Sequence, residues 1–369
     1  MPTRAATFAA LAALAGAAPA GAQEAAPVYQ AQDKSLAFHV DALLRQEWTR
    51  DIFVSATETR DEQRRRLRVL PRLEFGGDRF KLGVGGDFDY SSDENVEPKP
   101  ALLRDNYDSR DARLDLAFVR IEPARWLRLE GGRFEMPVPL TEMIWDRDLR
   151  PQGGALRLGH RDAAGTDRVS LTGLYAQGSH VFEDDDVKMY LASGQATFAG
   201  QSDSSLQLVA SYVAWDAPNG LEPMIRRQNT RLAGLLVRDY RVVDLQARMR
   251  PAFEPPVQLV VDYAWNTAAS EQNKGLWVAL VIGSVVTSRA RVEYVYSKMD
   301  KDVTLAAYAT DDFFWATGWE GHRGELATQT GNKGSVHLIG QLQRFKDSPR
   351  VEEREHWVKR ARIEFRFAY

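Results

Sequence analysis

The chain has 369 residues, a formal net charge of −3 and no cysteine. The absence of cysteine excludes disulfides, thiolate metal ligands and a cysteine nucleophile, and the slightly acidic charge balance provides no basic footprint for nucleic acid. The mean hydropathy is −0.40, and no run of about 18 apolar residues follows the N-terminal segment, so the sequence predicts no transmembrane helix.

The first residues have the pattern of an export signal. Arg4 precedes an Ala/Leu-rich stretch at 5–18, and Ala20-Gly21-Ala22 matches an A-x-A cleavage site. We expect a signal peptide at 1–22 and a short periplasmic segment at 23–35. Residues 36–369 are expected to form a single domain, because no linker, heptad or helical repeat divides them, and their alternating pattern, described next, predicts that this domain is an outer-membrane β-barrel.

Segments of about ten residues with alternating apolar and polar side chains then recur along the chain, which is typical of barrel strands. In 66–75, for example, Leu67, Val69 and Leu73 alternate with arginines. The predicted strands are 36–49, 66–75, 80–90, 111–121, 126–136, 153–160, 167–177, 187–198, 205–216, 242–252, 257–267, 275–283, 290–299, 322–330, 335–346 and 356–369. Pro71 cannot donate to a sheet ladder, so we expect a bulge there.

The connections between these strands alternate between short and long. Short ones at 122–125, 253–256 and 331–334 are expected to be periplasmic turns, and long ones at 91–110, 137–152 and 300–321 extracellular loops. If 217–241 is a loop, or a strand that projects beyond the membrane, the total is sixteen strands and both termini lie in the periplasm. Fourteen or eighteen strands are the alternatives.

The last strand has the strongest pattern. Its apolar face carries Ile363, Phe365, Phe367 and Tyr369, and its other face carries charges from Arg360 to Arg366. A soluble sandwich strand also alternates, but an aromatic exterior with a charged interior suits a strand between lipid and a water-filled lumen. The terminal aromatic residue resembles the closing strand of bacterial outer-membrane barrels.

The inward face is where we expect selectivity to reside. Its candidates are Arg66, Arg68, Arg72, Arg113, Arg128, Arg248, Arg250, Arg291, Arg360, Arg362, Arg366, Glu74, Asp115 and Glu293. These charges could simply pair across strands. Alternatively, the arginines could select anions. Because acids are almost as numerous, the sequence predicts at most a weak anion preference.

The 137–152 loop is too apolar for an exposed loop, since it carries Leu140, Met143, Ile144 and Trp145. We therefore predict that it folds into the barrel and narrows the pore. The predicted constriction residues are Asp146, Arg147, Asp148 and Arg150. The alternative is an ordinary packed surface loop.

Other candidate sites give weaker signals. His180 and the acidic run 183–186 could bind a divalent cation, but such a run is typical of a solvated loop tip. The six histidines have no metal-ligand spacing, so we predict no metal or cofactor. Five aromatic residues, Trp126, Trp265, Trp277, Trp357 and Tyr369, are predicted to face outward in interfacial belts.

Two stretches resemble known porins. Residues 131–137, Gly-Gly-Arg-Phe-Glu-Met-Pro, are similar to a strand end of phosphate-selective-type porins. Residues 275–280, 291–296, 310–313 and 318–322 resemble the C-terminal half of the "putative porin" family, so the similarity is good over 270–369 and loose before it. The resemblance implies a channel of about sixteen strands that forms a homotrimer. It does not extend to the arginine ladder and lysine cluster of phosphate-selective members.

The sequence therefore predicts a porin of the bacterial outer membrane and no enzyme. Its partners would be membrane lipid, lipopolysaccharide, and the small hydrophilic solutes or ions that diffuse through it. One alternative is a barrel lipase or protease, which needs a nucleophile and base that we do not recognise in the sequence. Another is a structural sleeve around a partner protein, which would favour an uncharged interior.

Overall fold

The computed structural model describes residues 35–77, 79–92, 111–161, 167–179, 187–200, 204–221, 228–310, 312–313, 315–331 and 333–369. The predicted signal peptide at 1–22, nearly all of the predicted periplasmic segment at 23–35, His180 and the acidic run 183–186 lie outside these residues.

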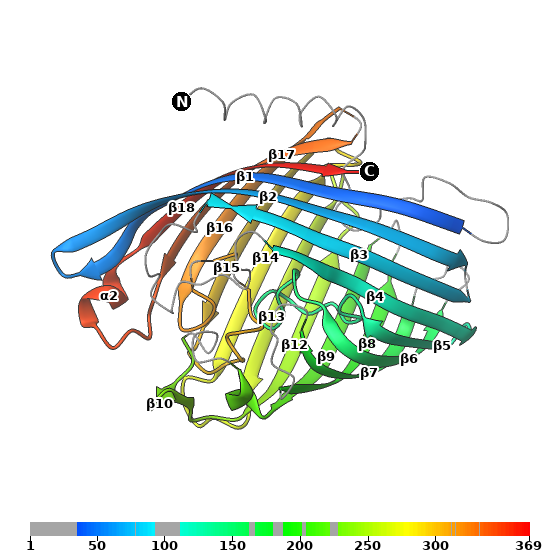
Figure 1. Cartoon of the computed structure of the whole chain (residues 1–369), viewed down its shortest axis with the longest axis horizontal. Coiled ribbons are helices and arrows are strands. Elements are labelled where there is room, and N and C mark those ends of the chain that lie inside the picture. The colour runs from blue at the N-terminus through cyan, green and yellow to red at the C-terminus, as the bar shows by residue number, and fades with distance from the viewer. Residues whose placement is uncertain are drawn as a thin grey trace.

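Sixteen strands of the described chain form one closed barrel, in the order β1-β18-β17-β16-β15-β14-β13-β12-β9-β8-β7-β6-β5-β4-β3-β2 (Figure 1). The predicted sixteen-stranded antiparallel barrel is confirmed. The strands are β1 (Ser35–Ser55), β2 (Glu58–Gly77), β3 (Phe80–Ser91), β4 (Asp111–Ala124), β5 (Leu127–Arg133), β6 (Pro151–Arg161), β7 (Asp167–Ser179), β8 (Lys188–Ala199), β9 (Ser205–Asp216), β12 (Tyr240–Arg250), β13 (Val257–Asn266), β14 (Lys274–Ser284), β15 (Ala290–Met299), β16 (Glu320–Thr330), β17 (Gly334–Arg344) and β18 (Val358–Ala368).

The connections between the barrel strands contain short secondary-structure elements. The 3-10 turn η3 (Pro218–Gly220) and the hairpin of β10 (Arg231–Leu232) and β11 (Leu235–Leu236) lie between β9 and β12, in the segment predicted to stay outside the barrel wall. The helix α2 (Val351–Glu355) follows β17. Among the described residues, no helix has the length and apolar character needed to cross a membrane.

The first and last strands close the barrel. β1 and β18 pair in antiparallel register from Asp41↔Ala368 to Arg50↔Lys359. Val40 N–H donates to Tyr369 O at 2.7 Å, and Tyr369 N–H donates to Val40 O at 2.8 Å. The terminal aromatic residue therefore takes part in the closing ladder.

Side chains alternate between the two faces of this wall, because successive residues of a strand point to opposite sides. Large apolar side chains such as Phe38, Leu73 and Phe365 are exposed on the outer surface. Glu47 and Asp87, on the opposite face of β1 and β3, are buried in the interior. This pattern of apolar outside and charged inside suits a lipid-facing barrel.

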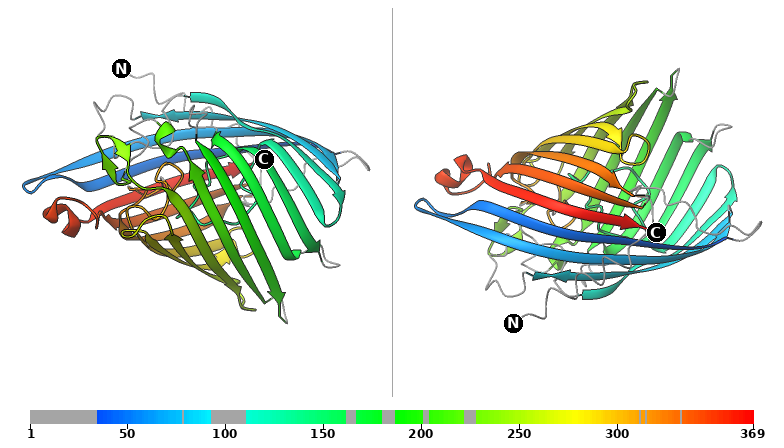
Figure 2. Two further views of the ribbon diagram at one scale, coloured as in Figure 1. Left: turned by 90° about the horizontal axis from the view of Figure 1, so that it is seen from below. Right: turned by 90° about the horizontal axis from the view of Figure 1, so that it is seen from above.

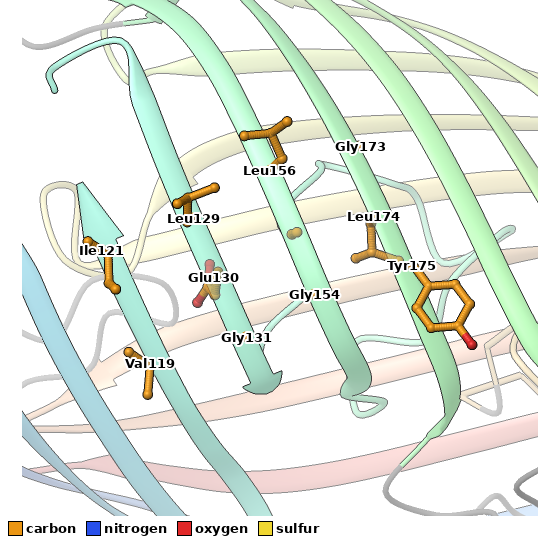
Figure 3. A pocket seen from close by; sticks show the side chains of 11 residues that line it. Val119, Ile121, Leu129, Glu130, Gly131, Gly154, Leu156, Gly173, Leu174 and Tyr175 are labelled. Atoms are coloured by element: carbon orange, nitrogen blue, oxygen red, sulfur yellow. The ribbon is translucent and has the colours of Figure 1, made fainter. Parts of the chain in front are cut away.

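The outer surface is hollowed across β5, β6 and β7. Gly131, Gly154 and Gly173 stand there next to Leu129 and Leu156, and together they border a shallow apolar groove of about 640 Å³ (Figure 3). The glycines carry no side chain to fill the space between the larger residues.

The hairpin of β1 and β2 projects past the other strands (Figures 1 and 2). These strands have 21 and 20 residues, whereas β17 and β18 have 11 each. The segment around α2 supports the hairpin: Arg350 Nη1 donates to Val54 O at 3.0 Å, and the rings of His356 and Phe53 lie 5.7 Å apart.

The bulge predicted at Pro71 is wrong. Pro71 pairs with Val40 of β1 in unbroken register, and the β2–β3 register is the same before and after it. The irregularity lies one strand away, where the β3–β4 register shifts between Gly85 and Gly86.

The alternation predicts unequal effects of substitutions on the two faces. Leu156→Arg places a charge on the lipid-facing surface and should lower the free energy of unfolding by about 2–4 kcal/mol. Arg157→Gln, at the next position on the inner face, should change it by less than about 1 kcal/mol. Urea unfolding in lipid vesicles measures both, and equal losses would contradict the assignment of faces.

Candidate pore constriction

Two loops lie inside the ring of strands. One is 134–150, between β5 and β6, and the other consists of the described residues 300–310, 312–313 and 315–319, between β15 and β16. Met143, Ile144 and Leu149 of the first loop and Leu305 and Trp319 of the second are completely buried. The first loop is the one predicted to fold inward, and the second had been expected outside.

The two loops bind each other. The rings of Trp145 and Tyr308 stack at 5.5 Å. Asp146 N–H donates to Tyr308 O at 2.8 Å, and Thr310 N–H donates to Glu142 O at 2.9 Å. Backbone hydrogen bonds and an aromatic stack therefore join them into one internal unit.

A third segment secures the second loop. Asn229, which precedes β10, donates from Nδ2 to Lys301 O at 2.8 Å and to Thr304 O at 2.9 Å. Its Oδ1 accepts from Ala306 N–H at 2.7 Å. The side-chain amide of Asn229 thus satisfies backbone groups of the second loop that would be paired with a neighbouring strand in a sheet.

The internal unit fills one side of the lumen with a hydrophobic core. Its apolar residues pack against the inner faces of β8, β9 and β12 to β15, where Trp215, Val242, Trp277 and Val295 are buried. The prediction that Trp277 faces outward is therefore wrong. Its ring lies 5.8 Å from Phe313 of the second loop and 5.7 Å from the guanidinium carbon of Arg323.

Polar contacts tie the first loop to this side of the wall. Thr141 Oγ1 donates to Asp262 of β13, and Arg248 of β12 donates to Pro139 O. Arg323 of β16 forms an ion pair with Glu142 at 2.8 Å.

Two further ion pairs tie the same loop to the opposite wall. Arg150 pairs with Asp115 of β4 at 3.0 Å, and Asp148 pairs with Arg68 of β2 at 2.7 Å. The 134–150 loop therefore crosses the lumen and is anchored at both sides.

A matching contact comes from the second loop. Asp312 pairs with Arg362 of β18 at 2.8 Å and with Arg45 of β1 at 3.5 Å. Asp148 and Asp312 thus fasten both loops to the neighbouring strands β18, β1 and β2.

The four predicted constriction residues take different positions. Arg147 has the most exposed side chain, at 68%, and pairs with Glu142 at 2.8 Å. Asp148 forms the ion pair with Arg68 described above, and we call this contact the latch. Asp146 is buried and accepts from Asp148 N–H at 2.9 Å, and Arg150 is nearly buried against the wall.

The fourteen predicted lumen residues lie on β2, β4, β5, β12, β15 and β18, and most of them form ion pairs. In β2, Arg66 pairs with Asp89 at 2.5 Å and Arg68 with Asp87 at 2.9 Å. Other ion pairs of these residues include Arg72–Glu74, Arg128–Glu122, Arg291–Glu293, Arg360–Glu47, Arg362–Glu47 and Arg366–Glu364. Arg248 hydrogen-bonds to Gln246, Arg113 on β4 is half-buried, and Arg250 is exposed at the end of β12.

A pair of carboxyl groups lies under the loop anchor at Thr141. Asp244 of β12 and Asp262 of β13 are both fully buried. Gln246 Nε2 also donates to Asp244 at 2.9 Å.

The sequence contained a signal for the second loop that we did not use. Residues 303–309 read Val-Thr-Leu-Ala-Ala-Tyr-Ala, and Trp315 and Trp319 follow. This apolar content is the same argument that predicted the inward fold of 137–152. Asp312 and Arg323 were missed as site residues because their partners lie far away in the sequence.

The comparisons with known proteins agree with this geometry. A family model described as "Putative porin" matches residues 53–220. Over these residues the chain is similar to the putative porins. The predicted resemblance is confirmed, although this match covers the N-terminal part of the barrel, whereas the residues quoted from the sequence lie mainly in 270–369.

Solved structures show the same fold. A double mutant of the Rhodopseudomonas blastica porin superimposes with a TM-score of 0.51 at 10% identity, covering 91% of this chain and 100% of that one. A triple mutant of the same porin gives a TM-score of 0.50 at 10% identity with the same coverage. No match was found among curated proteins.

The latch at Asp148 predicts a specific pH dependence. Burial raises the pKa of Asp148, but Arg68 and Arg66 outweigh it and hold that pKa at about 2, below the usual 3.8. The latch should therefore contribute its full stability above about pH 4 and lose it as the pH falls through about 2.

We expect single-channel conductance in planar bilayers to be constant from neutral pH to about pH 4 and to change only below it. Asp148→Asn should show the low-pH conductance already at neutral pH. A transition between pH 5 and 7 would show that Asp148 does not set the loop position.

Proposed function

We propose that the protein is a passive channel of the bacterial outer membrane for small hydrophilic solutes and ions. The observation that carries this proposal is the closed sixteen-stranded barrel with an apolar outer surface and a charged inner face. A barrel of this strand number encloses an aqueous passage. The match to porins over 53–220 supports the same function.

In this proposal the two internal loops form the constriction. They cover the β8–β14 side largely with apolar side chains. We place the passage for water and solutes along the charged strands β15 to β18 and β1 to β6. The predicted lumen residues on these strands, with Arg147 and Asp148 of the first loop, set the selectivity. A nearly balanced set of charges supports a weak anion preference.

The cellular setting belongs to the same proposal. Residues 1–22 are removed as a signal peptide, short turns face the periplasm, and the outer aromatic residues contact lipid and lipopolysaccharide. The mature chain assembles as a homotrimer. Support for the trimer comes from the sequence resemblance to porins.

Planar-bilayer recording tests the channel. The purified protein should give discrete, ohmic steps of current. Under a salt gradient it should give a small reversal potential, with the sign expected for a channel that prefers anions. Because the charges of the lumen nearly balance in number, the preference should be only a few-fold. The absence of steps from folded protein would overturn the proposal.

One observation bears on the alternative of a barrel enzyme. Ser335 Oγ lies 2.8 Å from His337 Nε2, and His337 Nδ1 lies 2.9 Å from Glu325 Oε1. This is the connectivity of a serine hydrolase triad, which we did not recognise from the sequence. However, Ser335 is only 2% exposed, and Glu325 also pairs with Arg291 at 3.2 Å. A buried hydroxyl cannot reach a substrate, so the three residues are better explained as part of the ion-pair network.

A fluorophosphonate probe distinguishes the two roles. We expect no labelling of the folded protein, because the Ser335 hydroxyl is covered. Labelling that Ser335→Ala abolishes would instead establish a nucleophile. Ser335→Ala should leave the single-channel conductance within about twofold of the wild-type value.

A further inference from the structure

We propose that Arg147, Arg291 and Arg366 form a subsite that binds the oxyanion group, carboxylate or phosphate, of a solute inside the lumen. The proposal rests on the proposed channel function and names the class of solute. The residues come from three elements: the 134–150 loop, β15 and β18.

The ion pairs of these arginines are unequally exposed. The side chains of Arg147, Arg291 and Arg366 are 68%, 23% and 33% exposed. Their glutamate partners are almost covered, with 3% for Glu142, 6% for Glu293 and 0% for Glu364. Each pair therefore presents its positive end to water, although the charges balance in number.

A continuous chain of ion pairs connects Arg147 to Arg291. Glu142 bridges Arg147 and Arg323, at 2.8 Å to each. Arg323 binds Glu293 at 3.0 Å, and Glu293 binds Arg291. The exposed Arg147 is thus held next to the wall rather than free to move across the lumen.

Arg366 joins the same region through the register of β17 and β18. It stands opposite Ser335, and its partner Glu364 stands opposite His337. His337 binds Glu325 at 2.9 Å, and Glu325 binds Arg291 at 3.2 Å. Arg147 and Arg366 are also the two cations that repel Arg291 most strongly.

The base of the subsite is rigid. Arg323 is buried, and its guanidinium carbon lies 5.3 Å from the ring centre of Phe313 and 5.7 Å from that of Trp277. These contacts place the cation over two aromatic faces. Because Arg323 is held in place, its ion pairs position Glu142 and Glu293. These glutamates in turn position Arg147 and Arg291.

The chemistry of the cluster favours an oxyanion. A guanidinium has five N–H donors in a planar fork, and Glu364 engages only Nε and Nη2 of Arg366. Glu325 and Glu293 already accept from Nη1 and Nη2 of Arg291. A solute oxyanion would therefore accept its paired hydrogen bonds chiefly from the exposed Arg147 and Arg366, with the charge of Arg291 adding to the attraction. The exposed carboxylate acting on the same region, Asp312, is already bound by Arg362 and Arg45.

The test is block of single-channel current by succinate and by inorganic phosphate, each titrated at constant ionic strength against chloride. Both anions should reduce the current through the wild-type channel, and the stronger one identifies the preferred group. Arg147→Gln and Arg366→Gln should each raise the half-blocking concentration about five- to tenfold. Arg147→Lys keeps the charge but loses the fork and should give an intermediate value.

Arg120→Gln is the matched control. Arg120 pairs with Glu130 at 2.8 Å and has the same arrangement of exposed arginine (26%) and buried glutamate (4%), but on β4 and β5. It should shift the half-blocking concentration less than twofold. If Arg120→Gln shifted the half-blocking concentration as much as Arg147→Gln and Arg366→Gln, the block would depend on the overall charge of the lumen and not on a subsite. That result would overturn the proposal.

Other outcomes separate this proposal from the channel function. A channel that conducts but shows no block by either oxyanion would overturn the subsite and leave the channel function in place. Folded protein without any conductance would overturn both. Heat-modifiable mobility on gels shows that each variant is folded, and Arg147 lies in a loop where substitution leaves the barrel ladder intact.

Discussion

Closure of the backbone hydrogen-bond ladder is the constraint on which the rest of the structure depends. In lipid, an unpaired backbone N–H or C=O costs several kcal/mol, so strands can span the membrane only if no edge remains. The β1–β18 pairing removes the last edge of this barrel. Closure also fixes which side chains face lipid, because a shift of one residue would turn every side chain to the other face.

This constraint explains why the strands were predictable and some other features were not. Between lipid and lumen the two environments differ so strongly that β18 alternates without exception from Arg360 to Arg366. The 50–65 segment alternates less because its hairpin projects beyond the other strands and both faces carry charge. Its strand character comes from cross-strand pairing, which no local pattern reveals. The inward position of Trp277 likewise depends on Phe313, a loop residue 36 positions away.

The candidate site was predictable in composition but not in geometry. Periodicity placed Arg291 and Arg366 on the inner face, and the apolar content of 137–152 indicated an internal loop. The ion-pair partners could not be predicted from the sequence, because residues such as Arg323 and Glu142 are separated by 181 residues. Which end of an ion pair is covered depends on packing around it. The count of charged residues therefore predicted an inner face that is nearly neutral. The structure shows instead that the glutamates are buried behind exposed arginines.

The internal hydrophobic core connects the loops to the charged side of the lumen. Trp145, Tyr308 and Trp215 form an aromatic series from the first loop through the second to the wall: Trp145 stacks on Tyr308 at 5.5 Å, and the tilted ring of Trp215 lies 6.0 Å from Tyr308. Because the apolar core occupies much of the β8–β14 side and disfavours water, the proposed path for ions and polar solutes lies along the other strands. That path runs along ion pairs whose field is stronger beside a low-dielectric wall than in open water. In the proposed channel, the apolar side of the lumen would therefore strengthen the effect of the charged side on the solutes that pass.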